Sequence, residues 1–347
     1  MMEEKVRRWV RADFGVGLVS LEDVAGGADE NARLWRGRTQ EGAAYAVKLS
    51  GGGSAAGPRV AGLLAAEEVP GVPGPLPARR GGWWSVRTGR RLSVVPWIDG
   101  TPALEGPMGA GHWRAFGRLL ARVHAAPVPP GMPPAQSHRP MADAVRALER
   151  WLLPASGAAP APAGDPLVRG LADAWREGSG RLAALVARAG ALRPAATDRA
   201  APGVICHADP HLGNVLLGDG DRVWLIDWDD AVCAAPEQDL LFVLGGVLPF
   251  AQVTDEQRTW FFEGYGPADL DADRLTYYRC VRALEDVAVP AAQVLDREGL
   301  PEGERAKALE IVRSVLSPTG LLDQALASPG QVSYRPSQGA ENPSRSG

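Results

Sequence analysis

Short apolar runs separated by turn-forming residues fill the amino-terminal part of the chain. Residues 33–38 alternate polar and apolar side chains, as a half-buried strand does, and a turn at residues 40–42 leads into an apolar strand at residues 45–49. A helix is expected over residues 59–69, and a hairpin over residues 83–95 that ends at a proline. The pattern predicts a small antiparallel sheet with one helix.

Further along the chain, the apolar spacing changes to that of helices. Phe116, Leu119, Leu120 and Val123 lie at i, i+3, i+4 and i+7, so one helix face is apolar. The segment from residue 328 to 347 is rich in Ser, Gly, Pro and Asn, which predicts a disordered tail. Further helices are expected near residues 145–152, 167–190, 237–248, 255–264, 271–291 and 303–317, and short strands at residues 204–206 and 223–226.

Composition narrows the class of protein. The 347 residues are 45% hydrophobic and 22% charged, as in globular proteins. A formal net charge of −4 excludes the strongly basic surface that nucleic acid requires. The charged amino terminus does not resemble a signal peptide, and no apolar run is long enough to predict a membrane span. Three cysteines without C-x-x-C spacing are expected to be reduced, which favours a cytoplasmic protein.

Lysine is rare in this chain. Of 37 lysines and arginines, only Lys5, Lys48 and Lys307 are lysines. Lys48 lies inside the apolar strand predicted at residues 45–49, where it indicates a site that needs a compact positive charge. The alternative is a lysine at a strand edge whose ammonium group reaches into solvent.

The strongest chemical signal is the run HADPHLGN at residues 207–214, followed by IDWD at residues 226–229. Phosphoryl transfer needs a carboxylate to accept the proton of an attacking hydroxyl, and oxygen ligands to hold magnesium. Asp209 and Asn214 share one loop, and Asp227 follows the next strand, so the three side chains can converge. The spacing therefore predicts a kinase site.

These runs resemble the aminoglycoside phosphotransferase superfamily, in which His207, Asp209 and Asn214 match an H-x-D-x-x-x-x-N pattern. The resemblance implies an α+β, bilobal protein-kinase-like fold, with a nucleotide-binding β lobe over residues 1–96 and a mostly helical lobe over residues 97–327. It implies that Asp209 is the catalytic base, that Asn214 and Asp227 bind Mg²⁺, and that ATP is the phosphate donor. Asp239, at the start of the helix that follows the metal loop, is expected to anchor the loop structurally.

In the amino-terminal lobe, the resemblance implies that Lys48 contacts the α- and β-phosphates of ATP. The loop from residue 26 to 31, with Gly26, Gly27 and Asn31, would cover those phosphates. Val95 and Trp97 would belong to the hinge, with backbone groups facing adenine.

One feature departs from the family pattern. The family lysine usually pairs with a glutamate of the next helix, but no acidic residue occurs between Leu49 and Ala66. Glu67 and Glu68 come only near the end of the predicted helix. Either one of them reaches Lys48, or the pairing is absent.

The acceptor is expected to be a hydroxyl-bearing small molecule, and the acidic protein favours a cationic one. Glu285 and Asp286 of the helix predicted at residues 271–291 are candidates to bind it, followed by Asp230 and Glu263. The runs CHADPHLGNVLL, IDWDDA and PEQDLLFVLGG are similar to the spectinomycin-phosphotransferase branch, which favours an aminocyclitol or aminoglycoside.

Three alternatives remain at this point. The superfamily also contains kinases of choline, homoserine and methylthioribose, so the acceptor could be a metabolite. A non-catalytic ligand-binding relative would share the fold. A metallohydrolase would use His207, Asp209 and His211, which alternate along the chain, but zinc would need another ligand.

Overall fold

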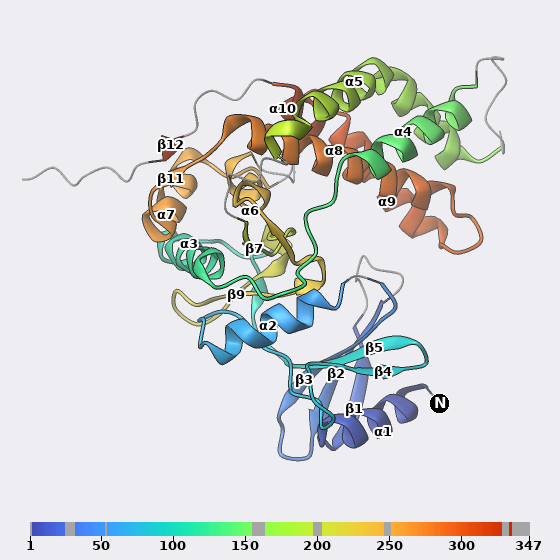
Figure 1. The fold of residues 1–347 in the computed structure, drawn as a ribbon. Helices are drawn as coiled ribbons and strands as arrows, with labels where there is room; N and C mark the ends of the chain where they lie inside the picture. Colours follow the sequence, from blue (N-terminus) through green and yellow to red (C-terminus); the bar gives the residue numbers. More distant parts are fainter. Residues whose placement is uncertain are drawn as a thin grey trace, which may run out of the picture.

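The computed structural model of the protein describes residues 2–24, 32–52, 54–154, 164–196, 203–245, 251–327 and 333–334. A smaller lobe built on an antiparallel sheet lies against a larger, mostly helical lobe (Figure 1). This arrangement confirms the predicted α+β, bilobal architecture. None of the helices in these residues is both long and apolar enough to cross a membrane.

The small lobe is a five-stranded sheet in the order β1-β2-β3-β5-β4, with every neighbouring pair antiparallel. Trp35 and Val47 alternate with more exposed neighbours and are fully buried, as the period-two pattern predicts. The strands are β1 (Leu18–Asp23), β2 (Ala32–Thr39), β3 (Ala44–Ser50), β4 (Ser85–Arg87) and β5 (Arg90–Pro96).

Helix α1 (Met2–Phe14) was not predicted from the sequence. Its buried residues Val6, Val10 and Phe14 follow each other at intervals of four, which places them on one helix face. These side chains join Trp35 and the other buried residues of the sheet in the core of the small lobe. The charged residues between them hide this stripe in a linear reading of the sequence.

Helix α2 (Ala56–Ala66) belongs by its packing to the large lobe. Val60, Ala61 and Leu64 are part of the large apolar cluster rather than of the core under the sheet. At Gly57 the helix lies directly on the turn after β9, because a Cβ there would come within 2.2 Å of the carbonyl oxygen of Trp228. The helix therefore connects the two lobes at the level of the cleft between them.

The large lobe contains the helices expected from the sequence and also α10, which was not predicted. The predicted helix end at residues 246–248 lies outside the described residues, as does the predicted tail apart from β12. The elements are β6 (Thr101–Pro102), α3 (Ala110–Ala125), α4 (Arg139–Leu152), α5 (Pro166–Ala196), β7 (Val204–Cys206), the 3₁₀ turn η1 (Leu212–Asn214), β8 (Val215–Leu217), β9 (Val223–Leu225), the 3₁₀ turn η2 (Trp228–Asp230), β10 (Val232–Ala234), α6 (Glu237–Leu244), α7 (Asp255–Tyr265), β11 (Ala268–Asp269), α8 (Ala272–Leu295), α9 (Glu302–Val315), α10 (Leu321–Leu326) and β12 (Ser333–Tyr334).

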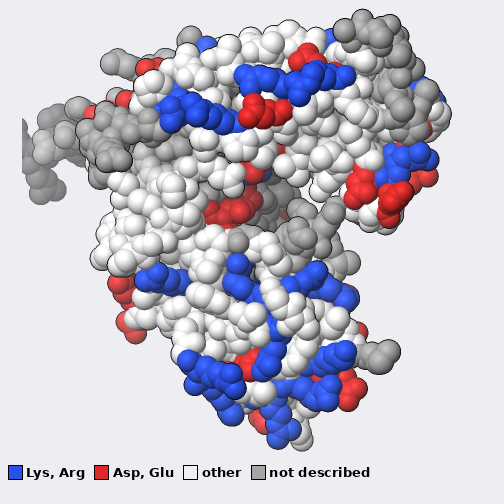
Figure 2. All heavy atoms as spheres, turned by 45° about the vertical axis from the view of Figure 1, so that its right-hand side comes forward, with Lys and Arg blue, Asp and Glu red and all other residues white. Residues whose placement is uncertain are grey.

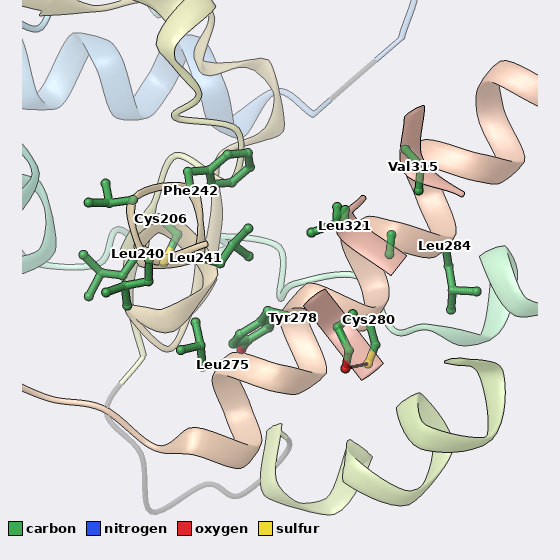
Figure 3. Close-up of a cluster of buried hydrophobic side chains, with 14 of the residues drawn as sticks. Cys206, Leu240, Leu241, Phe242, Leu275, Tyr278, Cys280, Leu284, Val315 and Leu321 are labelled. Atoms are coloured by element: carbon green, nitrogen blue, oxygen red, sulfur yellow. Dashed lines mark hydrogen bonds between the residues drawn. The ribbon is translucent and has the colours of Figure 1, made fainter. Parts of the chain in front are cut away.

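The helices that pack around α8 in the large lobe share one apolar core. Leu240, Leu241 and Phe242 of α6 lie beside Leu275 and Tyr278 of α8, and α9 and α10 also pack against α8 (Figure 3). Burial of these side chains fixes α6 and α8 relative to each other. Both helices carry polar residues of the site, so this core sets the geometry described next.

Candidate active site

The loop that follows β7, residues 207–214, is anchored by Asp239 of α6; it is called the catalytic loop below. The Asp239 carboxylate is fully buried and accepts hydrogen bonds from the backbone N–H groups of His207 (2.8 Å) and Ala208 (2.7 Å). These bonds hold the chain where Ala208 takes a positive φ of 72°, a conformation that is costly outside glycine. His124 of α3 also contacts Asp239, at 3.1 Å.

His207 organises the loop. Its buried ring donates through Nε2 to the carbonyl of Ile226 (2.9 Å), and its Nδ1 accepts a long bond from the N–H of Asp209 (3.3 Å). Both ring nitrogens are therefore engaged. The metallohydrolase interpretation loses its first ligand, because metal binding would need a free ring nitrogen. The side chains of His124, Cys206 and Asp239 also lie close enough together to hold a metal ion. The Asp239 carboxylate is already used, however, because it accepts hydrogen bonds from the backbone of the loop.

Asp209 and Asn214 are brought together as predicted. The side-chain amide of Asn214 donates from Nδ2 to the backbone carbonyl of Asp209 (2.9 Å), with a second, longer contact to Asp209 Oδ2 (3.4 Å). Because its nitrogen is used, Asn214 keeps its amide oxygen for a cation. His211 Nε2 lies 3.5 Å from the same Asp209 Oδ2, while its Nδ1 accepts from the N–H of Gly213.

Asp227 projects into the cleft from an unusual backbone conformation. Its φ of 62° and ψ of 65° are left-handed, so that the chain turns sharply between β9 and the turn η2. Its carboxylate accepts from Lys48 Nζ at 2.8 Å, and Asp229 Oδ2 lies 2.9 Å from the same ammonium. Lys48 of β3 thus reaches across the cleft to two carboxylates of one turn.

The charges of this cluster stabilise each other. Burial alone would lower the pKa of Lys48, but the carboxylates of Asp227 and Asp229 outweigh it and raise that pKa. Burial would raise the pKa of Asp227, yet the Lys48 ammonium lowers it. Lys48 stays cationic and Asp227 stays anionic, as phosphate and metal binding require.

The structure also shows whether Glu67 or Glu68 pairs with Lys48. Glu67 follows the last turn of α2 and Glu68 has a positive φ of 54°, and both are exposed. Among the described residues, the ion-pair partners of Lys48 are Asp227 and Asp229. The pairing with a helix glutamate is absent, and Asp229 supplies a second carboxylate instead. The sequence placed Asp229 beside the metal motif but did not indicate this contact.

A cavity of about 380 Å³ lies between the lobes and opens onto Lys48 and Asp227. Its volume is in the range of small-molecule sites. Val95 and Trp97 line it, and the N–H of Trp97 donates to the carbonyl of Ala44 (2.9 Å), so this group is engaged within the protein. Gly26, Gly27 and Asn31 lie outside the described residues. Apolar walls come from Val24, Leu34, Ala46, Val95, Leu216 and Ile226.

Three further acidic residues lie near Asp209: Glu285 and Asp286 of α8, and Asp230 of η2. Burial and nearby carboxylates raise the pKa values of Asp230 and Glu285, although Arg282 partly opposes the rise at Glu285. Within the described chain, neither side chain has a hydrogen-bond or ion-pair partner. Figure 2 shows acidic atoms in the hollow between the lobes.

The remaining two acidic candidates are already paired. Asp286 Oδ1 lies 2.8 Å from Nε of Arg282, and Glu263 of α7 accepts from Nε of Arg114 in α3 at 2.6 Å. Glu263 is therefore not a free carboxylate for an acceptor. Arg282 also reaches Asp209, a contact that the sequence did not predict, because nothing in a chain rich in arginine distinguishes this one.

Fold and site together define a protein-kinase-like phosphotransferase, in which a lysine of the sheet lobe faces an Asp–Asn–Asp set of the helical lobe. The profile of the phosphotransferase enzyme family matches residues 22–284. The chain belongs to this family, and it is a small-molecule phosphotransferase. No curated protein sequence is significantly similar to it.

Several solved structures share the fold. Spectinomycin phosphotransferase in complex with ADP and spectinomycin is 21% identical, with a TM-score of 0.81, and the alignment covers 94% of this chain and 98% of that one. An amicoumacin kinase with AMP-PNP, Ca²⁺ and its substrate is 16% identical (TM-score 0.62; 93% and 97% covered). A choline/ethanolamine kinase family protein from Mesorhizobium loti is 20% identical (TM-score 0.51; 94% and 99% covered).

Proposed function

We propose that this protein transfers the γ-phosphate of ATP to a hydroxyl of a small cationic molecule. The acceptor oxygen forms a bond to the γ-phosphorus, the bond from that phosphorus to the β–γ bridging oxygen breaks, and ADP leaves with the electron pair. Asp209 takes the hydroxyl proton. The observation that supports this most directly is the pairing of Asn214 with Asp209 and of Lys48 with Asp227, the second pair lining the cavity between the lobes. The two pairs adjoin, because the N–H of Ile226 donates to the carbonyl of Asn214 (3.0 Å).

The donor set suits Mg²⁺. The Asp227 carboxylate and the unused amide oxygen of Asn214 are the hard oxygen ligands that this ion prefers. Asp229 Oδ2 adds a buried carboxylate oxygen with no well-aligned hydrogen bond. When bound there, Mg²⁺ would neutralise charge on the phosphate oxygens. Lys48 would bind the phosphates, with Val95 and Trp97 on the adenine side of the cavity.

We favour an aminocyclitol or aminoglycoside such as spectinomycin as the acceptor. Asp230 and Glu285 support a cationic group, because two partly buried carboxylates with raised pKa values and no partner among the described residues would gain a counter-ion on binding it. The structural neighbour with a TM-score of 0.81 is a spectinomycin phosphotransferase, which is consistent with this substrate class.

A metabolite kinase for a choline-like acceptor is the second candidate, favoured by the structural match to a choline/ethanolamine kinase family protein. A quaternary ammonium group cannot donate a hydrogen bond to Asp230 or Glu285, whereas the amines of an aminocyclitol can. The two candidates therefore differ in the contacts that the acidic side of the site would make.

The test is a coupled ADP-release screen with aminocyclitols, aminoglycosides, choline and other cationic metabolites, each with Mg²⁺ and ATP. We expect acceptor-dependent ADP release with an amine-bearing polyol. Release with choline alone would favour the metabolite kinase. Nucleotide binding without turnover for every acceptor would favour the non-catalytic relative.

A further inference from the structure

Arg282 extends from α8 to the catalytic carboxylate. Its Nη1 donates to Asp209 Oδ1 at 2.7 Å, and its Nε lies 2.8 Å from Asp286 Oδ1 at an angle that suits an ion pair rather than a hydrogen bond. The guanidinium carbon lies 5.3 Å from the centre of the Phe242 ring. The side chain is only 20% exposed, so these three neighbours confine it.

The charges around Arg282 keep it protonated. Burial by itself would lower the pKa of this side chain, but the carboxylates of Asp286, Asp209 and Glu285 raise it. A permanent guanidinium with a rigid set of donors is well suited to fix a carboxylate in one orientation.

The contacts of the two Asp209 oxygens are unequal. Oδ1 accepts the short, charge-assisted bond from Arg282, whereas the contacts of Oδ2 with the described residues are the long ones to Asn214 (3.4 Å) and His211 (3.5 Å). One oxygen is therefore firmly held, and the other remains available for a further hydrogen bond. A base must present an oxygen within hydrogen-bond reach of the proton that it accepts.

We propose that Arg282 is a positioning residue for phosphoryl transfer: it fixes Oδ1 of Asp209 so that Oδ2 accepts the proton of the acceptor, and Asp286 holds Arg282 in place. The inference rests on the proposed function. It gives Asp286 a different role from that of Glu285, its neighbour on α8. Glu285 faces the acceptor as a free carboxylate, and Asp286 acts through the arginine.

A purely structural role would link α8 to the catalytic loop and nothing more. Removing one partner of a buried ion pair leaves the other charge uncompensated, which destabilises the folded state. In that case, removal of Arg282 would change the melting temperature, while folded enzyme would keep its turnover number. The positioning role predicts a different result, since a base displaced by about 1 Å can cost 10²-fold in rate.

The main experiment uses Arg282→Ala in the full-length enzyme, with the acceptor found in the screen. We expect kcat to fall about 10²-fold, while KM for ATP stays within about twofold because Lys48 and Asp227 are untouched. Added guanidinium ion, at concentrations below those that denature, should restore at least about a tenth of the lost rate in a saturable way. Sodium at equal ionic strength should restore nothing.

Arg279→Ala is the matched control. Arg279 lies one turn earlier on α8 and donates to a backbone carbonyl, that of Leu244 (2.8 Å), rather than to a carboxylate of the site. Its removal tests the loss of a partly buried α8 arginine by itself. We expect near-normal kcat and no response to guanidinium. An equal, unrescued loss in both alanine variants would overturn the proposal.

Arg282→Lys covers the case in which the alanine variant does not fold. It keeps the positive charge, but a compact ammonium lacks the planar fork that reaches both carboxylates. We expect a folded enzyme with a lowered kcat and unchanged KM for ATP. Wild-type kcat in this variant would overturn the proposed role of guanidinium geometry.

Asp286→Asn completes the test. If Asp286 acts by holding Arg282, the variant lowers kcat, and it adds little further loss in the Arg282→Ala background. An additive effect confined to the acceptor KM would make Asp286 an acceptor ligand and overturn the assignment. Failure of the proposed function is separate, because wild-type enzyme would then release no ADP with any acceptor.

Discussion

Gly57 offers a direct test of how α2 meets the turn that carries Asp227 and Asp229. In the structure α2 has no room for a side chain at this position, because an added Cβ would lie 2.2 Å from the carbonyl oxygen and 2.7 Å from the carbonyl carbon of Trp228. It would also lie 2.9 Å from the Cα of Asp229. All three atoms belong to the backbone and cannot rotate away. Gly57→Ala must therefore move the helix or the turn.

The size of the effect follows from these distances. Ordinary contact begins at 3.4 Å, so the backbones must separate by the difference from 2.2 Å, which is 1.2 Å. Overpacking of this kind costs about 1–3 kcal/mol, and the helix preference of alanine returns at most about 1 kcal/mol. With that full preference subtracted, we expect a net loss of up to about 2 kcal/mol in the free energy of unfolding. A turn displaced by that distance carries Asp227 and Asp229 with it, so kcat/KM for ATP should fall by about 10²-fold.

The assay is denaturant unfolding combined with steady-state ATP turnover, and Gly180→Ala is the control. Gly180 lies within α5, and a Cβ there meets no atom within 4 Å. This change should stabilise the protein by about 0.5–1 kcal/mol and leave kinetics unaltered. If Gly57→Ala is as stable and as active as the wild type, the close contact between α2 and the turn is not part of the working enzyme.

Four further substitutions separate the roles in the site. Asp209→Asn should bind ATP normally but lose about 10²–10⁴ in turnover, and wild-type turnover would exclude it as the base. Lys48→Arg should raise KM for ATP with little change in melting temperature; unaltered kinetics would make Lys48 a surface residue. Asp227→Ala should abolish the tightening of ATP binding by Mg²⁺ in a titration, and retained tightening would contradict its role as a ligand. Glu285→Gln should raise the acceptor KM about 10- to 100-fold without changing ATP binding; an unchanged acceptor KM would place the cation elsewhere.

Much of this architecture could be predicted because its signals are local. Asp209, Asn214 and Asp227 occur in two short runs, and the hairpin between them places them together. Lys48 could be identified because lysine is rare in this chain and because it lies in an apolar strand. The family resemblance then supplied the fold, which the structure confirms.

The remaining contacts depend on tertiary packing. Arg282 is one of many arginines, and only the packing of α8 against α6 brings it to Asp209. Asp229 contacts Lys48 because Asp227 takes a left-handed conformation, which a sequence pattern does not reveal outside glycine. Helix α1 was missed because charged residues interrupt its apolar stripe of Val6, Val10 and Phe14.

The most direct test of the central claim is to identify the product. Purified protein is incubated with ATP, Mg²⁺ and spectinomycin, or with the acceptor found in the screen, and the mixture is analysed by mass spectrometry and ³¹P NMR. The account predicts an acceptor that carries one phosphate ester, formed in equal amount to ADP, and no such product with Asp209→Asn. Release of inorganic phosphate with no phosphorylated acceptor, across the whole panel of amines and polyols, would contradict it.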